Sequence, residues 1–190
     1  MPLFSSRELG EIRILEKGFV QPQIDREFDI FLSHSYDDRK YVGAIRQVFE
    51  DMGYSVYVDW IVDSKVDRTQ VTPATANLLR KRMSKSRSLF YLTSDNALLS
   101  KWMPWELGYF DGMKQRVAIL PVTKEINPVN NYHGREYLGL YPYVYHENKL
   151  NDLKVQLIDS DKSISFKDWV EHGEDMLGKM TADLLKRMRL

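Results

Sequence analysis

The chain has 190 residues, 43% of them hydrophobic, which suffices for the core of one domain and excludes a disordered chain. Its 27 Lys and Arg balance its 27 Asp and Glu, so no basic surplus favours nucleic acid as a partner, and the absence of cysteine excludes a disulfide scaffold and a thiol nucleophile. Neither a signal peptide nor an apolar run of the ~18 residues needed to cross a membrane is present, so we expect a cytoplasmic protein with no membrane partner.

Short apolar runs rich in β-branched and aromatic residues predict the strands. In chain order they are Phe28–Ser33, Tyr54–Val58, Ser88–Thr93, Val117–Val122 and Tyr141–His146. Their nearly continuous apolar character is typical of central parallel strands that are covered on both faces.

Helical patterns separate and follow these runs. Thr72 before Pro73 is typical of an N-cap with a first-turn proline, and Ser165 with Asp168 resembles a capping box. The expected helices cover residues 41–52, 73–83, 104–114 and 165–190.

Alternating strands and helices with short links predict a parallel sheet with right-handed crossovers. We therefore expect an α/β fold, a flavodoxin-like doubly wound five-stranded parallel sheet with strand order 2-1-3-4-5. Residues 1–26 are interpreted as an N-terminal helical extension, 27–147 as the α/β domain and 148–190 as a C-terminal segment with a long amphipathic helix. Ligands of this fold bind at the carboxyl ends of the strands, so the loops there form the candidate site.

Four polar residues lie at the end of the first predicted strand. Ser33 is its last residue, His34 and Ser35 come directly after it, and Asp37 follows them. Hydroxyl and N–H groups at a helix N-terminus suit phosphate or sugar hydroxyls, but Ser and Asp also serve as helix caps, and both interpretations stay open.

The stretch SKWMPWELGYF, residues 100–110, contains one acid, Glu106, among aromatic residues. Trp102, Glu106 and Phe110 share one helix face at this spacing. Glu106 either lies at the polar rim of an amphipathic helix or is a functional carboxylate, since its helix starts at the ligand edge of the sheet beside indole rings.

The sequence lacks the motifs of several other kinds of functional site. The four histidines have no metal-ligand spacing, and neither a nucleophile elbow nor a phosphate-binding glycine loop is present. Thr93 and Ser94 occupy the position where a receiver domain needs its acceptor Asp. We therefore expect no metal and no cofactor.

Four segments in order resemble the Toll/interleukin-1 receptor (TIR) domain family. They are Glu27–Ser35 (EFDIFLSHS), Gly53–Asp59 (GYSVYVD), Met83–Ser94 (MSKSRSLFYLTS) and Ser100–Leu107 (SKWMPWEL). The last is similar to the family's S-x-W-x-x-x-E-L box. The resemblance implies that Glu106 is the catalytic carboxylate of an enzyme that cleaves NAD+ at the nicotinamide–ribose bond, with NAD+ as substrate. Ser33, His34, Ser35 and Asp37 are then candidate substrate-binding residues, and Trp60 and Trp102 are candidate stacking surfaces.

The resemblance further implies a product, ADP-ribose or a cyclic isomer of it. The compact layout is similar to TIR proteins of Thoeris anti-phage systems, which implies that the product signals to a separate effector protein. Self-association through the loop Asp59–Val71 is also implied, although residues 60–70 lack the Gly- or Pro-containing form common in the family and carry Asp63, Lys65, Asp67 and Arg68.

Two alternatives stay open. The first is a non-catalytic TIR scaffold that acts by TIR–TIR interaction. The second is a nucleoside deoxyribosyltransferase-like enzyme, which shares the flavodoxin-like topology and also uses a glutamate at a glycosidic carbon.

Overall fold

A computed structural model describes residues 3–14, 24–64, 71–123, 136–158 and 162–173. The strands are β1 (Phe4–Ser5), β2 (Phe28–Ser33), β3 (Val56–Tyr57), β4 (Ser86–Thr93), β5 (Val117–Thr123), β6 (Tyr143–His146), β7 (Leu153–Gln156) and β8 (Ser163–Ser165). The α-helices are α1 (Ser6–Gly10), α2 (Arg39–Asp51), α3 (Asp59–Val62), α4 (Pro73–Ser84) and α5 (Met103–Lys114). Short 3₁₀ turns are η1 (Tyr36–Asp38), η2 (Ala97–Leu99) and η3 (Glu136–Leu140), and residues 166–173 are helical.

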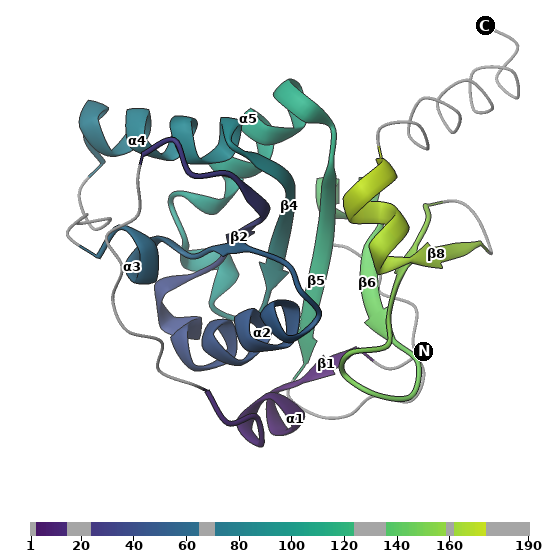
Figure 1. Cartoon of the computed structure of the whole chain (residues 1–190). Helices are drawn as coiled ribbons and strands as arrows, with labels where there is room; N and C mark the ends of the chain where they lie inside the picture. Colours follow the sequence, from purple (N-terminus) through teal and green to yellow (C-terminus); the bar gives the residue numbers. More distant parts are fainter. Residues whose placement is uncertain (1–2, 15–23, 65–70, 124–135, 159–161, 174–190) are drawn as a thin grey trace, which may run out of the picture.

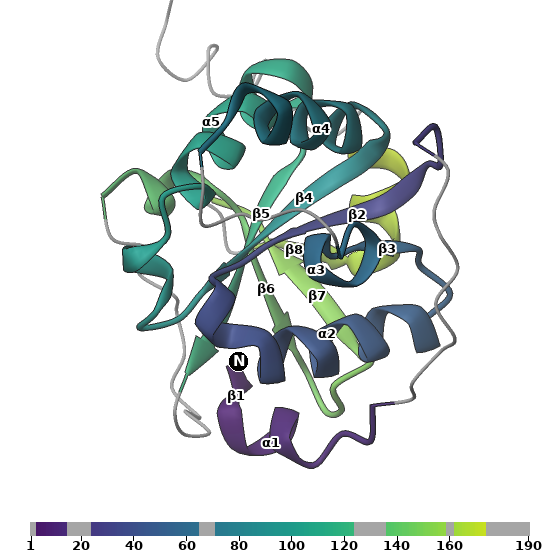
Figure 2. The same cartoon turned by 90° about the vertical axis from the view of Figure 1, so that its left-hand side faces the viewer.

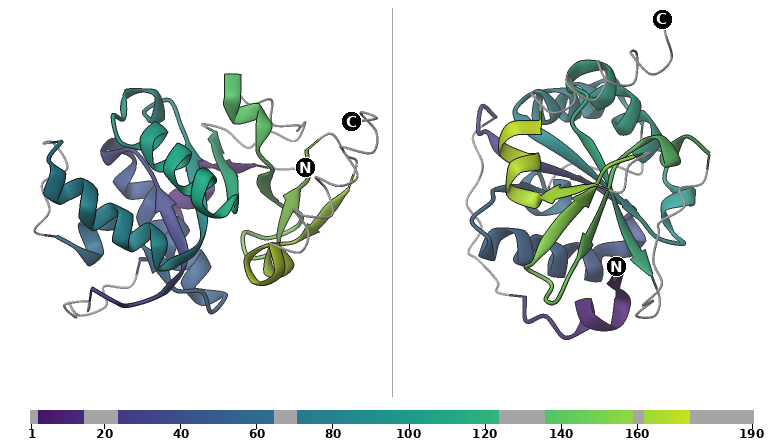
Figure 3. Two further views of the ribbon diagram at one scale, coloured as in Figure 1. Left: turned by 90° about the horizontal axis from the view of Figure 1, so that it is seen from above. Right: turned by 90° about the vertical axis from the view of Figure 1, so that its right-hand side faces the viewer.

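The strands form one sheet in the order β3-β2-β4-β5-β6-β7-β8 (Figure 1). The first five of these pair in parallel, which confirms the predicted order 2-1-3-4-5 and the doubly wound fold. The sequence did not predict β7 and β8, which extend the sheet with antiparallel pairing. Figure 3 shows these two strands and the helix at 166–173 extending beyond β6 at one edge.

Helices cover both faces of the sheet, as Figure 2 shows for α2 on one side and α4 and α5 on the other. The two faces carry separate cores: Ile30 and Leu32 of β2 belong to the core that contains Phe49 of α2, whereas Phe31 belongs to the core that contains Leu107 of α5. Successive side chains of a strand point to opposite faces, so the residue two positions after Phe31, Ser33, also faces α5.

Local signals fix where the helices begin and end. Thr72 caps α4, its Oγ1 accepting the Thr75 N–H at 3.1 Å, with Pro73 in the first turn as predicted. Gly53 adopts φ +93° after α2, a conformation that costs glycine little. Ser165 Oγ accepts the Asp168 N–H at 3.0 Å, so the predicted C-terminal helix does begin there; its remaining residues, 174–190, lie outside the described ranges.

The N-terminal residues form more than a helical extension. β1 pairs in parallel with the last residues of β5, Phe4 opposite Val122 and Ser5 opposite Thr123. Ser5 then begins α1 with a capping box, accepting the Glu8 N–H at 3.2 Å while its own N–H donates to Glu8 Oε2 at 3.1 Å. This pairing brings the start of the chain to the carboxyl edge of the sheet.

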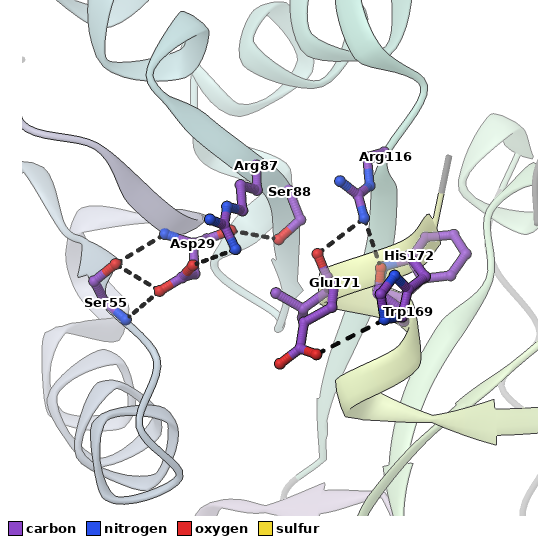
Figure 4. A network of polar contacts seen from close by, with 9 residues as sticks. Asp29, Ser55, Arg87, Ser88, Arg116, Trp169, Glu171 and His172 are labelled. Carbon is purple, nitrogen blue, oxygen red and sulfur yellow. Dashed lines mark hydrogen bonds and ion pairs between the residues drawn. The ribbon is translucent and has the colours of Figure 1, made fainter. Parts of the chain in front are cut away.

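The amino edge of the sheet is held by a polar network (Figure 4). Asp29 Oδ2 of β2 accepts both the Ser55 N–H, at 2.9 Å, and the Ser55 hydroxyl, at 2.7 Å, and Asp29 Oδ1 lies 3.4 Å from Arg87 Nη1. Arg116 Nη2 donates to the main-chain oxygens of Trp169 and Val170 at 3.1 and 2.9 Å. The contacts of Asp29 link β2 to the residue before β3 and to β4. The Arg116 bonds link the start of β5 to the helix at 166–173.

The loop Asp59–Val71 begins as a helix, since Asp59–Val62 form α3. Asp63 next to it is tied to α4: its two carboxylate oxygens accept from Arg82 Nε and Nη2 at 2.9 and 2.7 Å. The Arg82 side chain is only 1% exposed, so this pair belongs to the core. Lys65, Asp67 and Arg68 lie outside the described residues.

No helix among the described residues is long and apolar enough to cross a bilayer.

Candidate active site

Glu106 lies inside the protein, in contact with the carboxyl end of β2. The Ser33 hydroxyl donates a hydrogen bond of 2.6 Å to Glu106 Oε2, and both residues are 0% exposed. Ser33 ends β2 and faces α5, and Glu106 projects from the first turn of α5. Two segments 73 positions apart thus meet at the edge of the sheet where ligands of this fold bind.

The local sequence explains why Glu106 reaches this edge. β4 ends at Thr93, a short connection containing η2 follows, and α5 begins at Met103 with Pro104 in its first turn. The N–H of Glu106 donates to the main-chain oxygen of Trp102 at 2.8 Å, which closes the first helical turn. The positive end of the helix dipole at this turn favours a negative carboxylate.

His34 lies beside this pair and contacts the segment that follows β3. Its Nδ1 is 2.8 Å from the main-chain oxygen of Leu32 and its Nε2 is 3.1 Å from Trp60 Nε1. An indole nitrogen only donates, so Nε2 is the acceptor in the contact with Trp60. Asp59 Oδ1 also lies 3.3 Å from Nε2.

The loops after β2 and β4 are tied together by a buried acid, Asp38. Asp38 is 0% exposed and accepts the Ser94 hydroxyl at 2.5 Å and the Asn96 side-chain N–H at 2.8 Å. Asp37, the predicted candidate, is exposed, and Ser35 is buried without capping η1. The acid that organises this turn is Asp38, the residue after the predicted candidate.

The two candidate tryptophans differ in burial. Trp102 is 7% exposed and packs edge-to-face on Trp105 at 5.5 Å, within the core under α5. Trp60 is half-buried, and the Arg39 guanidinium lies 5.4 Å from its ring centre. Trp60 therefore presents ring surface at the carboxyl edge, whereas Trp102 supports the start of α5.

A cavity of about 200 Å³ opens at the carboxyl ends of β4 and β5, and we call it the β4–β5 pocket. Glu106 does not line it. Its walls come from β4, η2, the end of β5, η3 and the N-terminal segment, namely Leu3, Tyr91, Thr93, Ser94, Asp95, Ala97, Leu98, Pro121, Val122, Thr123 and Leu138.

Of the predicted site residues, the structure groups Glu106 with Ser33, and His34 with Trp60. Reasoning from sequence missed Asp38, Asp59 and the β4–β5 pocket. Asp59 had a weak signal, as an acid directly after a predicted strand. Within the described ranges, no three His, Asp or Glu side chains converge as a metal ion would need.

The TIR domain family matches residues 30–158. This chain is a member of the TIR domain family. The TIR match extends past His146, the last residue of β6, and takes in β7, which the predicted domain boundary at 147 left out. Membership favours the TIR interpretations over the deoxyribosyltransferase-like alternative.

Two curated relatives of this TIR protein have names that state an activity. It is 45% identical over 171 residues, 88% of each chain, to a protein of Bacillus cereus (strain MSX-D12) named "Probable 3' cyclic ADP-D-ribose synthase ThsB'". It is 33% identical over 107 residues, 56% of this chain and 28% of the relative, to the "Putative cyclic ADP-D-ribose synthase TIR2" of Cytobacillus dafuensis. Among solved structures, the TIR domain of the Toll-related receptor TRR-2 of Hydra magnipapillata matches 54% of this chain and 75% of its own, with 15% identity and a TM-score of 0.38.

Proposed function

We propose that this TIR protein cleaves NAD+ at the nicotinamide–ribose bond, with Glu106 as the catalytic carboxylate, and releases ADP-ribose or a cyclic isomer as a signal. The observation that carries the proposal is the buried hydrogen bond between Ser33 and Glu106 at the ligand edge of the sheet. A relative that shares 45% of its residues across 88% of both chains bears the name of a cyclic ADP-ribose synthase, which supports the same activity.

The proposed chemistry needs one carboxylate. When the bond between ribose C1′ and the nicotinamide nitrogen breaks, its electron pair neutralises the pyridinium ring, so the leaving group needs no proton. The ribose becomes oxocarbenium-like, as in glycoside cleavage. A carboxylate fixed beside this ribose stabilises the developing positive charge, and Glu106, which is buried, supplies it.

The neighbouring side chains have supporting roles in this proposal. The Ser33 hydroxyl keeps Glu106 oriented before substrate arrives, and a ribose hydroxyl takes its place as donor when substrate binds. Trp60, held by His34, offers its ring to the nicotinamide, and Ser35 lies where the chain leaves β2. Asp37 is exposed at the rim, and Trp102 contributes by positioning α5.

Access to Glu106 requires movement. The residue is 0% exposed, so substrate reaches the carboxylate only after neighbouring side chains shift. We propose that the chain is nearly inactive until a trigger or self-association through the loop Asp59–Val71 opens this site. A separate effector protein then receives the nucleotide product.

The decisive experiment follows nicotinamide and the nucleotide products by liquid chromatography and mass spectrometry, using purified chain and NAD+. Trials with the chain at increasing concentration and with a crowding agent promote self-association. We expect nicotinamide release by the wild type and by Glu147→Ala, a control at an exposed glutamate, and none above background by Glu106→Ala. Equal release by the wild type and Glu106→Ala in every condition would sink the proposal.

A non-catalytic scaffold is the second candidate, and the complete burial of Glu106 favours it. A scaffold predicts that Glu106→Ala leaves phage defence intact in cells while Lys65→Glu with Arg68→Glu abolishes it. Asp63 is unsuitable for this test, because removing it leaves the buried Arg82 guanidinium without its carboxylate and destabilises the fold. Loss of defence with Glu106→Ala excludes the scaffold.

A further inference from the structure

The β4–β5 pocket begins next to the proposed catalytic pair. Ser33 of β2 is the direct Cα partner of Tyr91 of β4, and Tyr91 forms one wall of the pocket. Tyr91 also belongs to the core that packs under α5, so it shares a face of the sheet with Ser33 and Glu106. Neighbouring strands lie about 4.8 Å apart, so the wall of the pocket that Tyr91 forms is about one strand spacing from Ser33.

The size and lining of the pocket indicate what enters it. Its volume of about 200 Å³ is below the roughly 300–1,000 Å³ of sites that enclose a drug-sized ligand, so it takes one ring system rather than a whole dinucleotide. Leu3, Leu98 and Leu138 supply apolar walls, and Thr93 and Asp95 supply a hydroxyl and a carboxylate. The carboxylate disfavours a phosphate there and can accept a hydrogen bond from a ring amino group.

A second ring-binding surface lies on the other side of the pair. β3 and β4 flank β2 on opposite sides, and Trp60 with its partner His34 lies on the β3 side. The end of β2, where Ser33 contacts Glu106, thus lies between a half-buried indole, which packs against the core on the α2 side, and a ring-sized pocket. A substrate with two rings, one at each end, matches this arrangement.

We infer that the β4–β5 pocket holds the adenine base of NAD+ and thereby determines whether the product is cyclic or linear. This inference rests on the proposed NAD+ cleavage. With nicotinamide against Trp60 and adenine in the pocket, the dinucleotide is folded across Glu106, and the adenosine ribose lies at the pocket mouth. After the C1′–nitrogen bond breaks, a hydroxyl oxygen of that ribose bonds to C1′ and its proton passes to the Glu106 carboxylate.

Water gives linear ADP-ribose instead whenever the adenosine is not held. Leu3 makes this outcome depend on the N-terminal segment, because β1 pairs with Val122 and Thr123 and so places Leu3 in the pocket wall. The segment is therefore part of the substrate site rather than an appendage.

The test uses a matched pair on η2. Leu98 and Leu99 are adjacent and similarly exposed, at 68% and 76%, but only Leu98 lines the pocket. Leu98→Trp and Thr93→Leu reduce the space for adenine, and we expect each to lower the ratio of cyclic to linear product about tenfold, with a smaller fall in nicotinamide release. Leu99→Trp is expected to keep that ratio within about twofold of the wild type.

Inhibition measurements identify which ring of NAD+ the β4–β5 pocket binds. Adenosine monophosphate is expected to inhibit Leu98→Trp and Thr93→Leu more weakly than the wild type, while inhibition by nicotinamide is unchanged. The inference is overturned if nicotinamide inhibition weakens instead, if both filled variants keep the wild-type product ratio, or if the wild type makes only linear product. Each of these outcomes leaves NAD+ cleavage intact, whereas absence of nicotinamide release by the wild type refutes the proposed function itself.

Discussion

The two edges of the sheet use carboxylates in opposite ways. At the amino edge, Asp29 is partly exposed, accepts two hydrogen bonds from Ser55 and lies next to the Arg87 guanidinium. At the carboxyl edge, Glu106 is completely buried and accepts a hydrogen bond from the Ser33 hydroxyl. The Asp29 carboxylate joins neighbouring strands. The Glu106 carboxylate is held by a rotatable hydroxyl, which a substrate hydroxyl can replace as the hydrogen-bond donor.

This difference separates a carboxylate that serves stability from one that serves chemistry. Burying a carboxylate costs free energy, and Glu106 is completely buried where the fold binds ligands, so we expect Glu106 to be retained for chemistry rather than for stability. Functional sites commonly sacrifice stability in this way. The comparison therefore predicts that substitutions at the two edges change different measured quantities.

The largest expected effect is that of Glu106→Gln. The amide keeps the shape and can still accept the Ser33 bond but carries no charge, so nicotinamide release should fall about 10²–10³-fold while the midpoint of thermal unfolding is kept. Asp29→Asn is the matched change at the amino edge, with a lower unfolding midpoint and an unchanged rate of release. If both variants lose activity equally, the functional distinction between the edges is wrong.

Arg116→Met should give the largest loss of stability at the amino edge. The variant removes the donor to the main-chain oxygens of Trp169 and Val170, which should lower the free energy of unfolding by about 2–3 kcal/mol. Urea denaturation measures this loss. Nicotinamide release per folded molecule should match that of the wild type, and a selective loss of activity would show that the two edges are coupled.

A pair of serines tests the same contrast with a smaller change. Ser33→Ala removes the donor that orients Glu106 and should reduce nicotinamide release about tenfold, because the carboxylate is no longer held in position before substrate binds. Ser88 Oγ donates to the Asp29 main-chain oxygen at 2.8 Å, and Ser88→Ala should cost about 1 kcal/mol of stability without slowing the reaction. Steady-state kinetics and urea denaturation of both variants decide between these outcomes.

The smallest effect concerns Tyr141, whose hydroxyl donates to Asp111 Oδ2 at 3.0 Å. Burial, and then this bond to the carboxylate, raise the pKa of Tyr141 to about 12, from an ordinary 10.0. The neutral phenol is therefore favoured in the folded state, and its stabilising contribution is complete below pH 10.0 and lost as the pH rises to about 12. The unfolding midpoint of Tyr141→Phe should decline less across that interval, and an identical decline would refute this assignment.

Elements with strong local patterns were predictable from the sequence. The central strands and the helices after Thr72 and Pro104 have clear periodicity or caps, and parallel pairing follows from their alternation. Glu106 was identifiable as a candidate because an acid in an apolar helix at the ligand edge is unusual, and its catalytic role stays a prediction. The strand Phe4–Ser5 was not, since two residues carry no periodicity and its partner lies more than a hundred positions away.

The interior of the site was less predictable for a related reason. Asp37 and Asp38 are adjacent acids, and only the packing of the loop after β4 determines which one turns inward. Trp60 and Trp102 are both aromatic residues near the edge, yet one is half-buried and the other belongs to the core. Such choices depend on contacts between distant segments, which a single sequence does not show.

The pairing of β1 with β5 also has a consequence for how the chain folds. Phe4 and Ser5 find their partners only after Thr123 has been synthesised, more than a hundred residues later, so this contact carries the entropy cost of closing a long loop. A strand of two residues detaches at little cost compared with global unfolding. Amide hydrogen exchange should therefore be fastest at β1 among the strands, and each detachment removes Leu3 from the pocket wall, which makes the N-terminus a natural place to regulate the site.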